Sequence, residues 1–269
     1  MEELRERLDI LLIKKGIFSS RERARENIIN GKIFVDGKVV TKCGKKILQD
    51  SNIEFKGEPL KYVSRGGLKL EKALLKFNIN LQDKVCIDIG ASTGGFTHCM
   101  LLNGAKQVFA VDVGRDQLHE SLRNHEKVIS YEETNVRALN KNHFGTLGDF
   151  ASIDVSFISL EKIMENVLGL LHEKGEIMAL IKPQFEAGHK YLNKKGVVKD
   201  KVVHKEVMLR LYETFNSLNM KILNFSYSPV KGPNGNIEYL IYLTKDCTKE
   251  NNIFSTDIHN VISEAFNCL

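Results

Sequence analysis

Short apolar runs alternate with amphipathic segments of helical length over most of the chain. Seven runs have the length and composition of β-strands: 85–89, 107–111, 128–131, 150–155, 176–181, 222–227 and 237–243. Three segments between them have the apolar period of helices: 96–103, 159–171 and 201–218. Strands that alternate with helices favour a parallel sheet covered on both sides. We therefore predict a doubly wound α/β fold with helices on both faces of the sheet.

The first 60 residues have a different pattern. Apolar residues recur at helical spacing over residues 4–12, and this first predicted helix stops at Gly16. A second predicted helix starts after Ser19 or Ser20, both good N-cap residues, and ends at Gly31. Arg21, Arg23 and Arg25 lie within one and a half turns of this helix. Two short helices are therefore expected before any strand.

A β-hairpin is predicted after the second helix. Asp36-Gly37 is a dipeptide that favours a type I′ turn, and β-rich residues flank it in the segment 33–40. Residues 52–55 predict one more short strand. Helices followed by a hairpin make this part of the chain a small α+β domain.

The change of pattern places a domain boundary near residue 60. A chain of 269 residues is long enough for one large domain and one small domain. We predict the small α+β domain at 1–60 and the α/β domain at 61–269, with 61–67 as the linker.

Composition and local sequence are typical of a globular cytoplasmic protein. Apolar residues make up 42% and charged residues 27% of the chain, which are ordinary values. Charges interrupt the apolar positions at the start of the chain, unlike in a signal peptide, and no apolar run approaches the roughly 18 residues of a membrane span. The five cysteines have no CxxC spacing, so we expect free thiols and no metal site.

The net charge of +5 is concentrated at the start of the chain. Residues 1–61 contain 14 Lys and Arg against 10 Asp and Glu, whereas the remainder contains 25 against 24. A basic excess in less than a quarter of the sequence is typical of a part that meets a polyphosphate. A solvated basic face without a partner is the alternative that charge alone leaves open.

The order of helix, basic helix, glycine and Asp-Gly hairpin resembles the alpha-L RNA-binding module. This module occurs in a small-subunit ribosomal protein, in pseudouridine synthases and in tyrosyl-tRNA synthetases, and the resemblance covers residues 3–58. It implies that the second helix and the hairpin present cations to the phosphates of folded RNA. The implied RNA-binding residues are Arg21, Arg23, Arg25 and Lys32, to which we add Arg65 in a basic segment near the domain junction.

A glycine-rich turn follows the first predicted strand of the α/β domain. The segment Asp88-x-Gly90-x-Ser92-x-Gly94 lies between a strand and a helix, and Asp112 ends the next strand. Such a turn lets a ligand approach the helix N-terminus, and an acidic residue after the second strand can accept hydrogen bonds from a ribose. A nicotinamide site would have glycine at position 92, and Asp88 would repel a pyrophosphate. A cationic sulfonium with an ammonium group suits Asp88 better.

A third ligand class competes for the same turn. Residues 90–94 also match G-x-S-x-G, the nucleophile elbow of α/β-hydrolases, and His204 and Asp200 could serve as triad partners of Ser92. That fold needs several strands before its elbow, and only 31 residues separate Ser92 from the small domain. The length of the chain therefore disfavours the hydrolase interpretation.

Two charged residues follow apolar strands at the edge where such sheets bind ligands. They are Asp154 in SIDVSFISL and Lys182 in LIKPQFE, and a buried charge is costly unless it has a partner or a task. These segments, with SRGGLKL, DIGASTGGFT and GNIE, resemble in order and spacing the TlyA (haemolysin A) family of rRNA 2′-O-methyltransferases, which is related to the FtsJ methyltransferases. The resemblance covers essentially the whole chain.

The resemblance implies a Rossmann-like class I methyltransferase sheet, S-adenosyl-L-methionine as cofactor, and rRNA or ribosomal subunits as partner. Its catalytic tetrad falls on Lys69, Asp154, Lys182 and Glu238. The cofactor-binding residues that we derive from the turn and the resemblance are Asp88, Gly90, Ala91, Ser92, Gly94, Gly95, Phe96, Asp112, Asn135 and Asp154. One departure is His98, where relatives commonly have Asp.

The tetrad suits the methylation of a ribose hydroxyl, which is a poor nucleophile until a base takes its proton. We expect Lys182 to be that base, because two lysines that approach each other in a desolvated site lower the pKa of one of them. Asp154 would orient Lys182 and lie near the sulfonium, while Lys69 and Glu238 would position the hydroxyl and balance charge. The expected function is an S-adenosylmethionine-dependent rRNA 2′-O-methyltransferase, with cytidine in 16S or 23S rRNA as the family's usual target.

Two other function classes remain open at this point. A non-catalytic rRNA-binding or ribosome-assembly factor would keep the fold without turnover. A membrane-active haemolysin would need an amphipathic span longer than any in this sequence.

Overall fold

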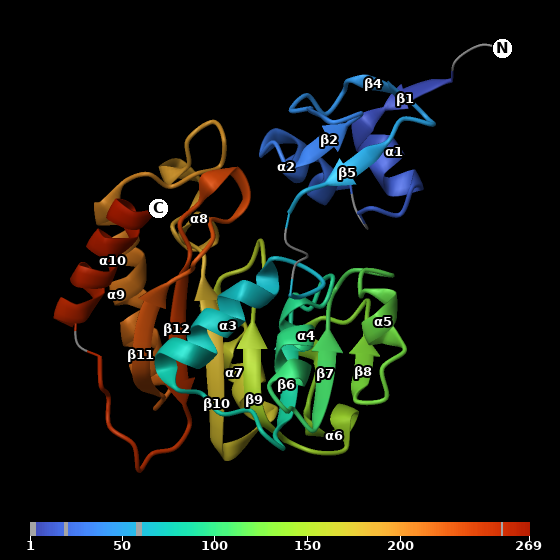
Figure 1. Ribbon diagram of the computed structural model, residues 1–269. Coiled ribbons are helices and arrows are strands. Elements are labelled where there is room, and N and C mark those ends of the chain that lie inside the picture. Colours follow the sequence, from blue (N-terminus) through green and yellow to red (C-terminus); the bar gives the residue numbers. More distant parts are fainter. Residues whose placement is uncertain (1–3, 19–20, 58–60, 254) are drawn as a thin grey trace. The chain divides into compact units, whose positions relative to one another are not determined.

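The computed structural model describes residues 4–18, 21–57, 61–253 and 255–269, and the chain forms two compact units (Figure 1). The units are residues 1–59 and 60–269, so the boundary lies where the sequence pattern changes. The N-cap residues predicted for the second helix, Ser19 and Ser20, lie outside the described residues.

The first unit is a small α+β domain with two helices and five short strands among its described residues. Its elements are β1 (Arg5–Arg7), α1 (Leu8–Lys14), α2 (Arg21–Ile29), β2 (Ile33–Val35), β3 (Lys38–Val39), β4 (Lys46–Leu48) and β5 (Ile53–Phe55). β2 pairs with β3 and with β5, and β1 pairs with β4. The Asp-Gly hairpin is confirmed, since Asp36 and Gly37 have φ angles of 49° and 76°, as a type I′ turn requires.

The first predicted helix begins later than the apolar spacing suggested. Residues 5–7 form a strand because they pair with residues 46–48 in antiparallel register. Asp9, near the start of α1, is fully buried and accepts hydrogen bonds from Arg7 at 2.9 Å and from Arg21 at 2.9 Å. The hydrogen bond from Arg7 is the largest of the effects that lower the pKa of Asp9 to about 2. This ion cluster joins the two helices beside the apolar core of the unit.

The second unit contains a seven-stranded sheet in the order β11-β12-β10-β9-β6-β7-β8. Its strands are β6 (Val85–Ile89), β7 (Gln107–Val111), β8 (Val128–Tyr131), β9 (Gly148–Ile153), β10 (Leu171–Ile181), β11 (Lys221–Tyr227) and β12 (Tyr239–Thr244). β12 is antiparallel to β10 and β11, whereas β10, β9, β6, β7 and β8 are mutually parallel. The predicted α/β sheet is confirmed, with one antiparallel strand.

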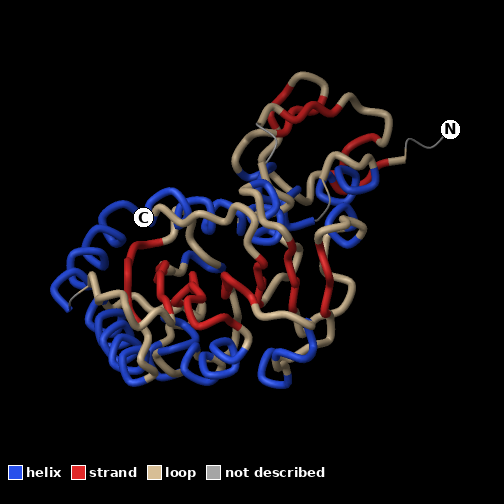
Figure 2. The backbone as a smooth tube through the Cα atoms, turned by 90° about the horizontal axis from the view of Figure 1, so that it is seen from below, coloured by secondary structure: helices blue, strands red, loops and turns tan. Residues whose placement is uncertain are grey.

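Helices cover both faces of this sheet (Figure 2). The α-helices are α3 (Gly66–Phe77), α4 (Gly95–Leu102), α5 (Glu120–Arg123), α6 (Lys141–Phe144), α7 (Met164–Gly169), α8 (Pro183–Glu186), α9 (Lys201–Ser217) and α10 (Ser255–Cys268). Single 3-10 turns lie at η1 (Val136–Ala138), η2 (Leu160–Lys162), η3 (His189–Tyr191) and η4 (Pro233–Gly235).

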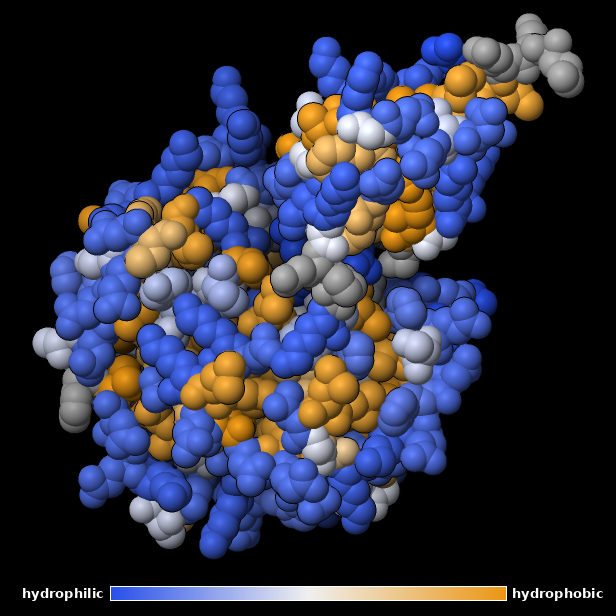
Figure 3. Space-filling model, in the orientation of Figure 1, coloured by the Kyte–Doolittle hydropathy of each residue, from blue (hydrophilic) through white to orange (hydrophobic). Residues whose placement is uncertain are grey.

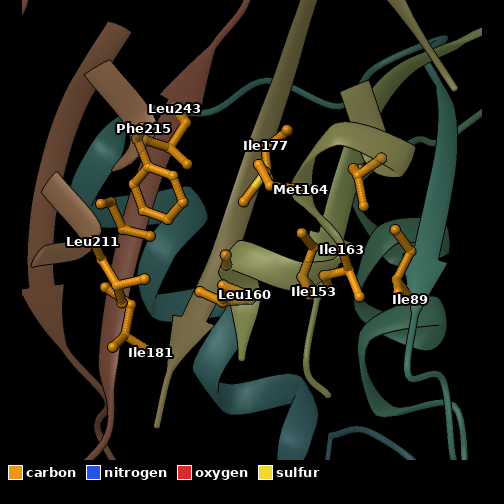
Figure 4. Packing of buried hydrophobic residues seen from close by; sticks show 14 of the residues in the cluster. Ile89, Ile153, Leu160, Ile163, Met164, Ile177, Ile181, Leu211, Phe215 and Leu243 are labelled. Atoms are coloured by element: carbon orange, nitrogen blue, oxygen red, sulfur yellow. The ribbon is translucent and has the colours of Figure 1, made fainter. Parts of the chain in front are cut away.

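Side chains of one strand alternate between two apolar cores. Ile177, Ala179 and Ile181 of β10 belong to the core under α7, α9 and α10, which Figure 4 shows in close-up. Met178 and Leu180 of the same strand belong to the core under α3 and α4. Even-numbered residues of β6, β9, β10 and β12 therefore face α3 and α4, and odd-numbered residues face the other core.

Helix α3 was not predicted from the sequence, and only its first two residues overlap the predicted linker 61–67. Leu70, Leu74 and Phe77 of this helix are buried against the sheet, and Tyr62 before it is only 2% exposed in the same core. Residues 61–67, which were predicted as the linker at the start of the second domain, lie in the second unit. The start of the helix has no apolar period, because it begins with two glycines, 66 and 67, after a short polar stretch.

Two further differences concern segment ends. The single helix predicted at 159–171 is a 3-10 turn at 160–162 followed by α7, and Leu171 already begins β10. Helix α10 was not predicted, although it packs against α9 and contributes Ile258 and Ile262 to the core. Among the residues that the structure describes, no helix has both the length and the apolar character needed to cross a bilayer.

Paired leucine substitutions in α3 test how this helix packs. Leu70 is fully buried and Leu75, one and a half turns later, is 79% exposed. Leu70→Ala should lower the free energy of unfolding by about 2–5 kcal/mol because it removes buried methyl groups and leaves a cavity. Leu75→Ala, the same chemical change on the outer face, should change it by less than about 0.5 kcal/mol. Urea unfolding measures both, and equal effects would contradict this packing.

Candidate active site

The strand ends bring charged side chains from distant parts of the sequence to one edge of the sheet. The carboxyl ends of β6, β9 and β10 meet the amino end of the antiparallel β12 there. Asp154 and Lys182 directly follow β9 and β10, and Glu238 directly precedes β12. All three residue numbers are even, like those of the strand residues whose side chains lie on the face of the sheet that α3 covers. Lys69 comes from α3 itself, so the four predicted tetrad residues are expected to converge.

The structure confirms that these four side chains lie together. Lys182 Nζ lies 2.6 Å from Asp154 Oδ1, and Lys69 Nζ lies 3.7 Å from Asp154 Oδ2. Lys69 Nζ also donates a hydrogen bond to Glu238 Oε2 at 2.7 Å. The charges therefore alternate in the order Lys182, Asp154, Lys69, Glu238.

Burial makes this alternation necessary. Lys69 and Lys182 are 9% and 8% exposed, and Glu238 is fully buried. Burial alone would lower the pKa of Lys69, but Asp154 and Glu238 outweigh burial and raise it. Burial alone would raise the pKa of Asp154, but Lys69 and Lys182 outweigh burial and lower it. We expected repulsion between Lys69 and Lys182 to lower the pKa of one of them. This does not hold for Lys69, because a carboxylate lies on each side of its ammonium group.

Glu238 lies behind the other three residues. In addition to its bond with Lys69, its Oε1 accepts a hydrogen bond from Gln184 Nε2 at 3.4 Å. A Cβ atom added to Gly232 would collide with the Glu238 carboxylate, so the loop before β12 also closes over it. Because Glu238 has no exposed surface, its carboxylate balances the charge of Lys69 and holds that side chain in place.

Asp88 is likewise out of reach of a ligand. It is fully buried, its Oδ2 accepts hydrogen bonds from the backbone and the hydroxyl of Thr97 at 2.9 and 2.7 Å, and its Oδ1 accepts one from Ser152 at 2.9 Å. The direct contact with a cationic ligand that we expected of Asp88 does not fit this geometry. Asp88 instead fixes the first turn of α4 to β9.

The glycine-rich turn leaves an open stretch of backbone beside these charges. Gly90, Ser92 and Gly94 have φ angles of 84°, 47° and 89°, and a Cβ at Gly90 would collide with the carbonyl oxygen of Asp154. Glycine is therefore required at 90 for the turn to pack on the end of β9. Ser92 and Thr93 at the tip of the turn are exposed. A ligand can therefore approach this backbone close to Asp154.

The other predicted cofactor residues divide into two groups. Asp112 is partly exposed, and its carboxylate accepts hydrogen bonds from the backbone N–H groups of Ser92 at 2.8 Å and Gly114 at 2.7 Å, each oxygen retaining a lone pair. Asn135 is exposed and caps the turn η1. The second group consists of buried residues in the turn and at the start of α4: Ala91, Gly95 and Phe96.

Four of the five residues predicted to bind RNA belong to the first unit, and the fifth, Arg65, belongs to the second. Arg21, Arg25 and Lys32 are exposed in the first unit, and Arg23 is half-buried on the same helix, α2. Arg21 also pairs with Asp9, so part of its charge is used within the unit. Arg65 is exposed and directly precedes α3 in the second unit.

His98, the departure from the family pattern, contacts the segment that precedes α3. Its Nδ1 accepts a hydrogen bond from the backbone of Val63 at 3.2 Å, and its ring packs edge-on against Tyr62. Burial lowers the pKa of His98 below its ordinary value. The residue therefore ties α4 to the segment before α3.

The sequence analysis missed four residues that support the tetrad and Asp88. Ser156 accepts a hydrogen bond from Lys182 at 3.1 Å, and Gln184 donates to Glu238. Both lie two residues after a tetrad member, which is the signal that could have indicated them. Ser152 and Thr97 hold Asp88, and only the folded strand order brings Ser152 to it.

The arrangement can bind a positively charged ligand group and move a proton. Asp154 is the member of the tetrad with the most exposed side chain, at 20%, and it presents a carboxylate next to the open turn. A sulfonium cofactor fits these residues, because the turn offers bare backbone, Asp112 offers acceptors for ribose hydroxyls, and Asp154 offers negative charge near the reacting centre. Lys182 beside it can accept a proton after losing its own.

Each of the two units matches a known protein family or domain. Residues 62–245 match the model of the FtsJ-like methyltransferase family, and residues 6–52 match that of the S4 domain. YqxC of Bacillus subtilis (strain 168) is 46% identical over 244 residues, covering 90% of this chain and 87% of that protein. The "16S/23S rRNA (cytidine-2'-O)-methyltransferase TlyA" of Mycobacterium tuberculosis (strain ATCC 25618 / H37Rv) is 35% identical over 263 residues, covering 97% of this chain and 98% of that protein.

Solved structures include a similar protein from Streptococcus thermophilus. It is 42% identical with a TM-score of 0.80, and the match covers 98% of this chain and 97% of that one.

Asp88→Asn should change how stability depends on pH. Burial raises the pKa of Asp88 from 3.8 to about 6, against the hydrogen bonds from Thr97 and Ser152. A raised pKa means that the stability contributed by Asp88 is present below about pH 4 and is lost as the pH rises through about 6. Two pKa units correspond to about 3 kcal/mol. Asparagine keeps the shape and has no proton to lose.

The free energy of unfolding of Asp88→Asn minus that of the wild type should therefore rise by about 3 kcal/mol between pH 4 and pH 7, since the other groups cancel in the difference. Urea unfolding at a series of pH values measures it. A difference that is flat across this range would show that Asp88 ionises as readily in the folded chain as in the unfolded one.

Proposed function

Since the chain belongs to the TlyA family of FtsJ-like methyltransferases and carries an S4 domain, we propose that it methylates a ribose 2′-hydroxyl of ribosomal RNA with S-adenosylmethionine as the methyl donor. The observation that carries the proposal is the 2.6 Å pair of Lys182 and Asp154 at the strand edge, with the glycine turn packed against the Asp154 backbone. Lys182, the candidate base, thus lies beside Asp154, a carboxylate that can attract a positively charged ligand group.

Residues of the turn and of the next two strand ends would hold the cofactor. The backbone at 90–94 would approach its methionine part, and Asp112 and Asn135 would accept from or donate to its adenosine part. When bound, the cofactor supplies an electrophilic methyl group on a positively charged sulfur. Asp154 would attract that charge.

Lys182 would take the proton of the ribose hydroxyl. Its Nζ lies between Asp154 Oδ1 and Ser156 Oγ, which fixes its position. To act as a base, Lys182 must first give up its own proton. A second positive charge close to Asp154 favours this, because it competes with Lys182 for the same carboxylate. Nζ of Lys182 would receive the hydroxyl proton as the ribose oxygen attacks the methyl group that the cofactor supplies, with the sulfur as the leaving group.

Lys69 would place the hydroxyl and remain charged. Its raised pKa makes it a poor base, so the roles of the two lysines differ because their partners differ. Lys69 has two carboxylate neighbours, Asp154 and Glu238, whereas Lys182 has Asp154 and a serine hydroxyl. The cationic Lys69 can donate a hydrogen bond to the ribose oxygen as that oxygen gains negative charge.

The substrate assignment follows the relatives and the first unit. The M. tuberculosis relative is named for methylating cytidine in 16S and 23S rRNA, and the Campylobacter jejuni relative for cytidine in 23S rRNA. We assign cytidine in ribosomal RNA as the target, with the S4 domain contributing Arg21, Arg23, Arg25 and Lys32 to RNA binding. The reaction would then take place in the cytoplasm, where thiols such as the five free cysteines of this chain stay reduced.

Lys182→Arg and Lys182→Met test the assigned base. Arginine keeps a positive charge beside Asp154 but cannot accept a proton near neutral pH. Both variants should lose about 100-fold to 10,000-fold in kcat for methyl transfer to ribosomal RNA, while their affinity for that RNA stays within about threefold of the wild type. Transfer of labelled methyl groups from S-adenosylmethionine gives the rate, and resistance of the product to alkaline cleavage shows that the ribose carries the methyl group.

Lys162→Met, a substitution in the turn η2 away from the tetrad, is the matched control and should keep full activity. Methyl groups on bases, or unchanged transfer by Lys182→Arg, would contradict the proposed mechanism. Equal RNA binding by all forms with no transfer by the wild type would instead indicate a non-catalytic binding factor.

A further inference from the structure

Two loops of the second unit carry a concentration of positive charge that the proposed mechanism does not use. They are residues 187–199, between α8 and α9, and residues 228–237, between β11 and β12; we call them the basic loop pair. The pair contains five lysines, Lys190, Lys194, Lys195, Lys199 and Lys231, and the acidic residues that directly follow the two loops are Asp200, which caps α9, and Glu238 of the tetrad. The remainder of the second unit is by contrast nearly balanced in charge.

All five lysines are available to a partner. Each is exposed, and none of them forms an ion pair with another residue in the part of the chain that the structure describes. Lys190 Nζ lies 4.8 Å from the ring centre of Tyr191, whose side chain is also exposed. Figure 3 shows hydrophilic side chains projecting from the end of the unit at which α8 lies. Unpaired cations with an exposed aromatic ring are typical of a surface that binds a nucleic-acid backbone.

Side-chain amides fasten the two loops to each other. Asn234 Nδ2 donates a hydrogen bond to the carbonyl of Lys195 at 2.9 Å, and Asn236 Nδ2 donates to the carbonyl of Gly196 at 3.2 Å. Asn236 is only 4% exposed, and Val197 and Val198 anchor the first loop in the protein interior. The lysines therefore extend from a fixed backbone, which reduces the entropy lost when they bind a ligand.

The basic loop pair also adjoins the tetrad. The first loop follows α8, whose preceding residue is Lys182, and the second loop directly precedes Glu238. Gly232 of the second loop packs directly on the Glu238 carboxylate. Phosphates held by these loops would therefore belong to nucleotides close to the reacting ribose.

We propose that the basic loop pair is a second RNA-binding surface, which binds phosphates of the strand that carries the target nucleotide. The inference rests on the proposed function for its choice of RNA over another polyanion. The S4 domain would supply affinity for a folded region of the RNA, and the basic loop pair would hold the strand at the active site. Its role is to position the substrate, so its removal should raise KM and leave kcat unchanged at saturating RNA.

The test compares two triple substitutions of the full-length chain. Lys194→Ala, Lys195→Ala and Lys231→Ala remove charge from the basic loop pair. The control removes the same charge from three exposed lysines at the opposite edge of the sheet: Lys127 before β8, Lys174 in the first half of β10 and Lys249 after β12. Binding to protein-free ribosomal RNA is measured over a range of salt concentrations, without turnover, together with KM and kcat for methyl transfer.

We expect the loop variant to bind RNA at least about tenfold more weakly at low salt. Its slope of log K against log salt should be smaller by about 2–3, because each substituted lysine that would neutralise a phosphate contributes about one unit to the slope. The control variant should behave as the wild type.

Equal slopes for both variants would overturn the proposal, and so would a loop variant that loses binding only to vesicles of anionic lipid. Because binding is read without turnover, absence of methyl transfer by the wild type would refute the proposed function while leaving this result interpretable.

Discussion

The second unit depends on a buried ion array that can exist only when complete. Lys69, Asp154, Lys182 and Glu238 are largely withdrawn from water, and each cation has a carboxylate within 2.7 Å. Removing a charge from water costs several kcal/mol, which the neighbouring opposite charge offsets only with close geometry. Deleting one member therefore leaves another buried and unpaired. The same low polarity strengthens every electrostatic effect on a reacting hydroxyl, so stability and chemistry share one set of contacts.

Strand direction and side-chain alternation assemble this array. Parallel strands deliver Asp154 and Lys182 to one edge, and the antiparallel β12 delivers Glu238 to the same edge from its opposite end. The even parity of all three turns them toward α3, where Lys69 lies one residue before the buried Leu70. A shift of one residue in any of these strands would turn its charge into the other apolar core. Register is therefore as important to the site as the identity of its residues.

Strong local signals made much of this arrangement predictable. The strands β6, β7 and β8 have the predicted bounds, and the Asp36-Gly37 hairpin forms as its turn chemistry requires. Motif resemblance indicated all four members of the array. It could not show that Glu238 and Asp88 are fully buried, because burial depends on which strands become neighbours: Ser152 reaches Asp88 only since β9 lies beside β6. For the same reason α3 was not predicted and β1 was predicted as helix, since each is stabilised by partners distant in the sequence.

A double-mutant cycle on Lys69 and Glu238 tests the central claim most directly. Lys69→Met, Glu238→Gln and the double variant would be unfolded in urea, and the coupling energy calculated from the four free energies of unfolding. The account predicts that each single substitution costs about 3–5 kcal/mol, while the double variant costs at least about 2 kcal/mol less than their sum, because neither then leaves a buried charge alone. Additive losses would show that the two side chains do not depend on each other and would contradict the account.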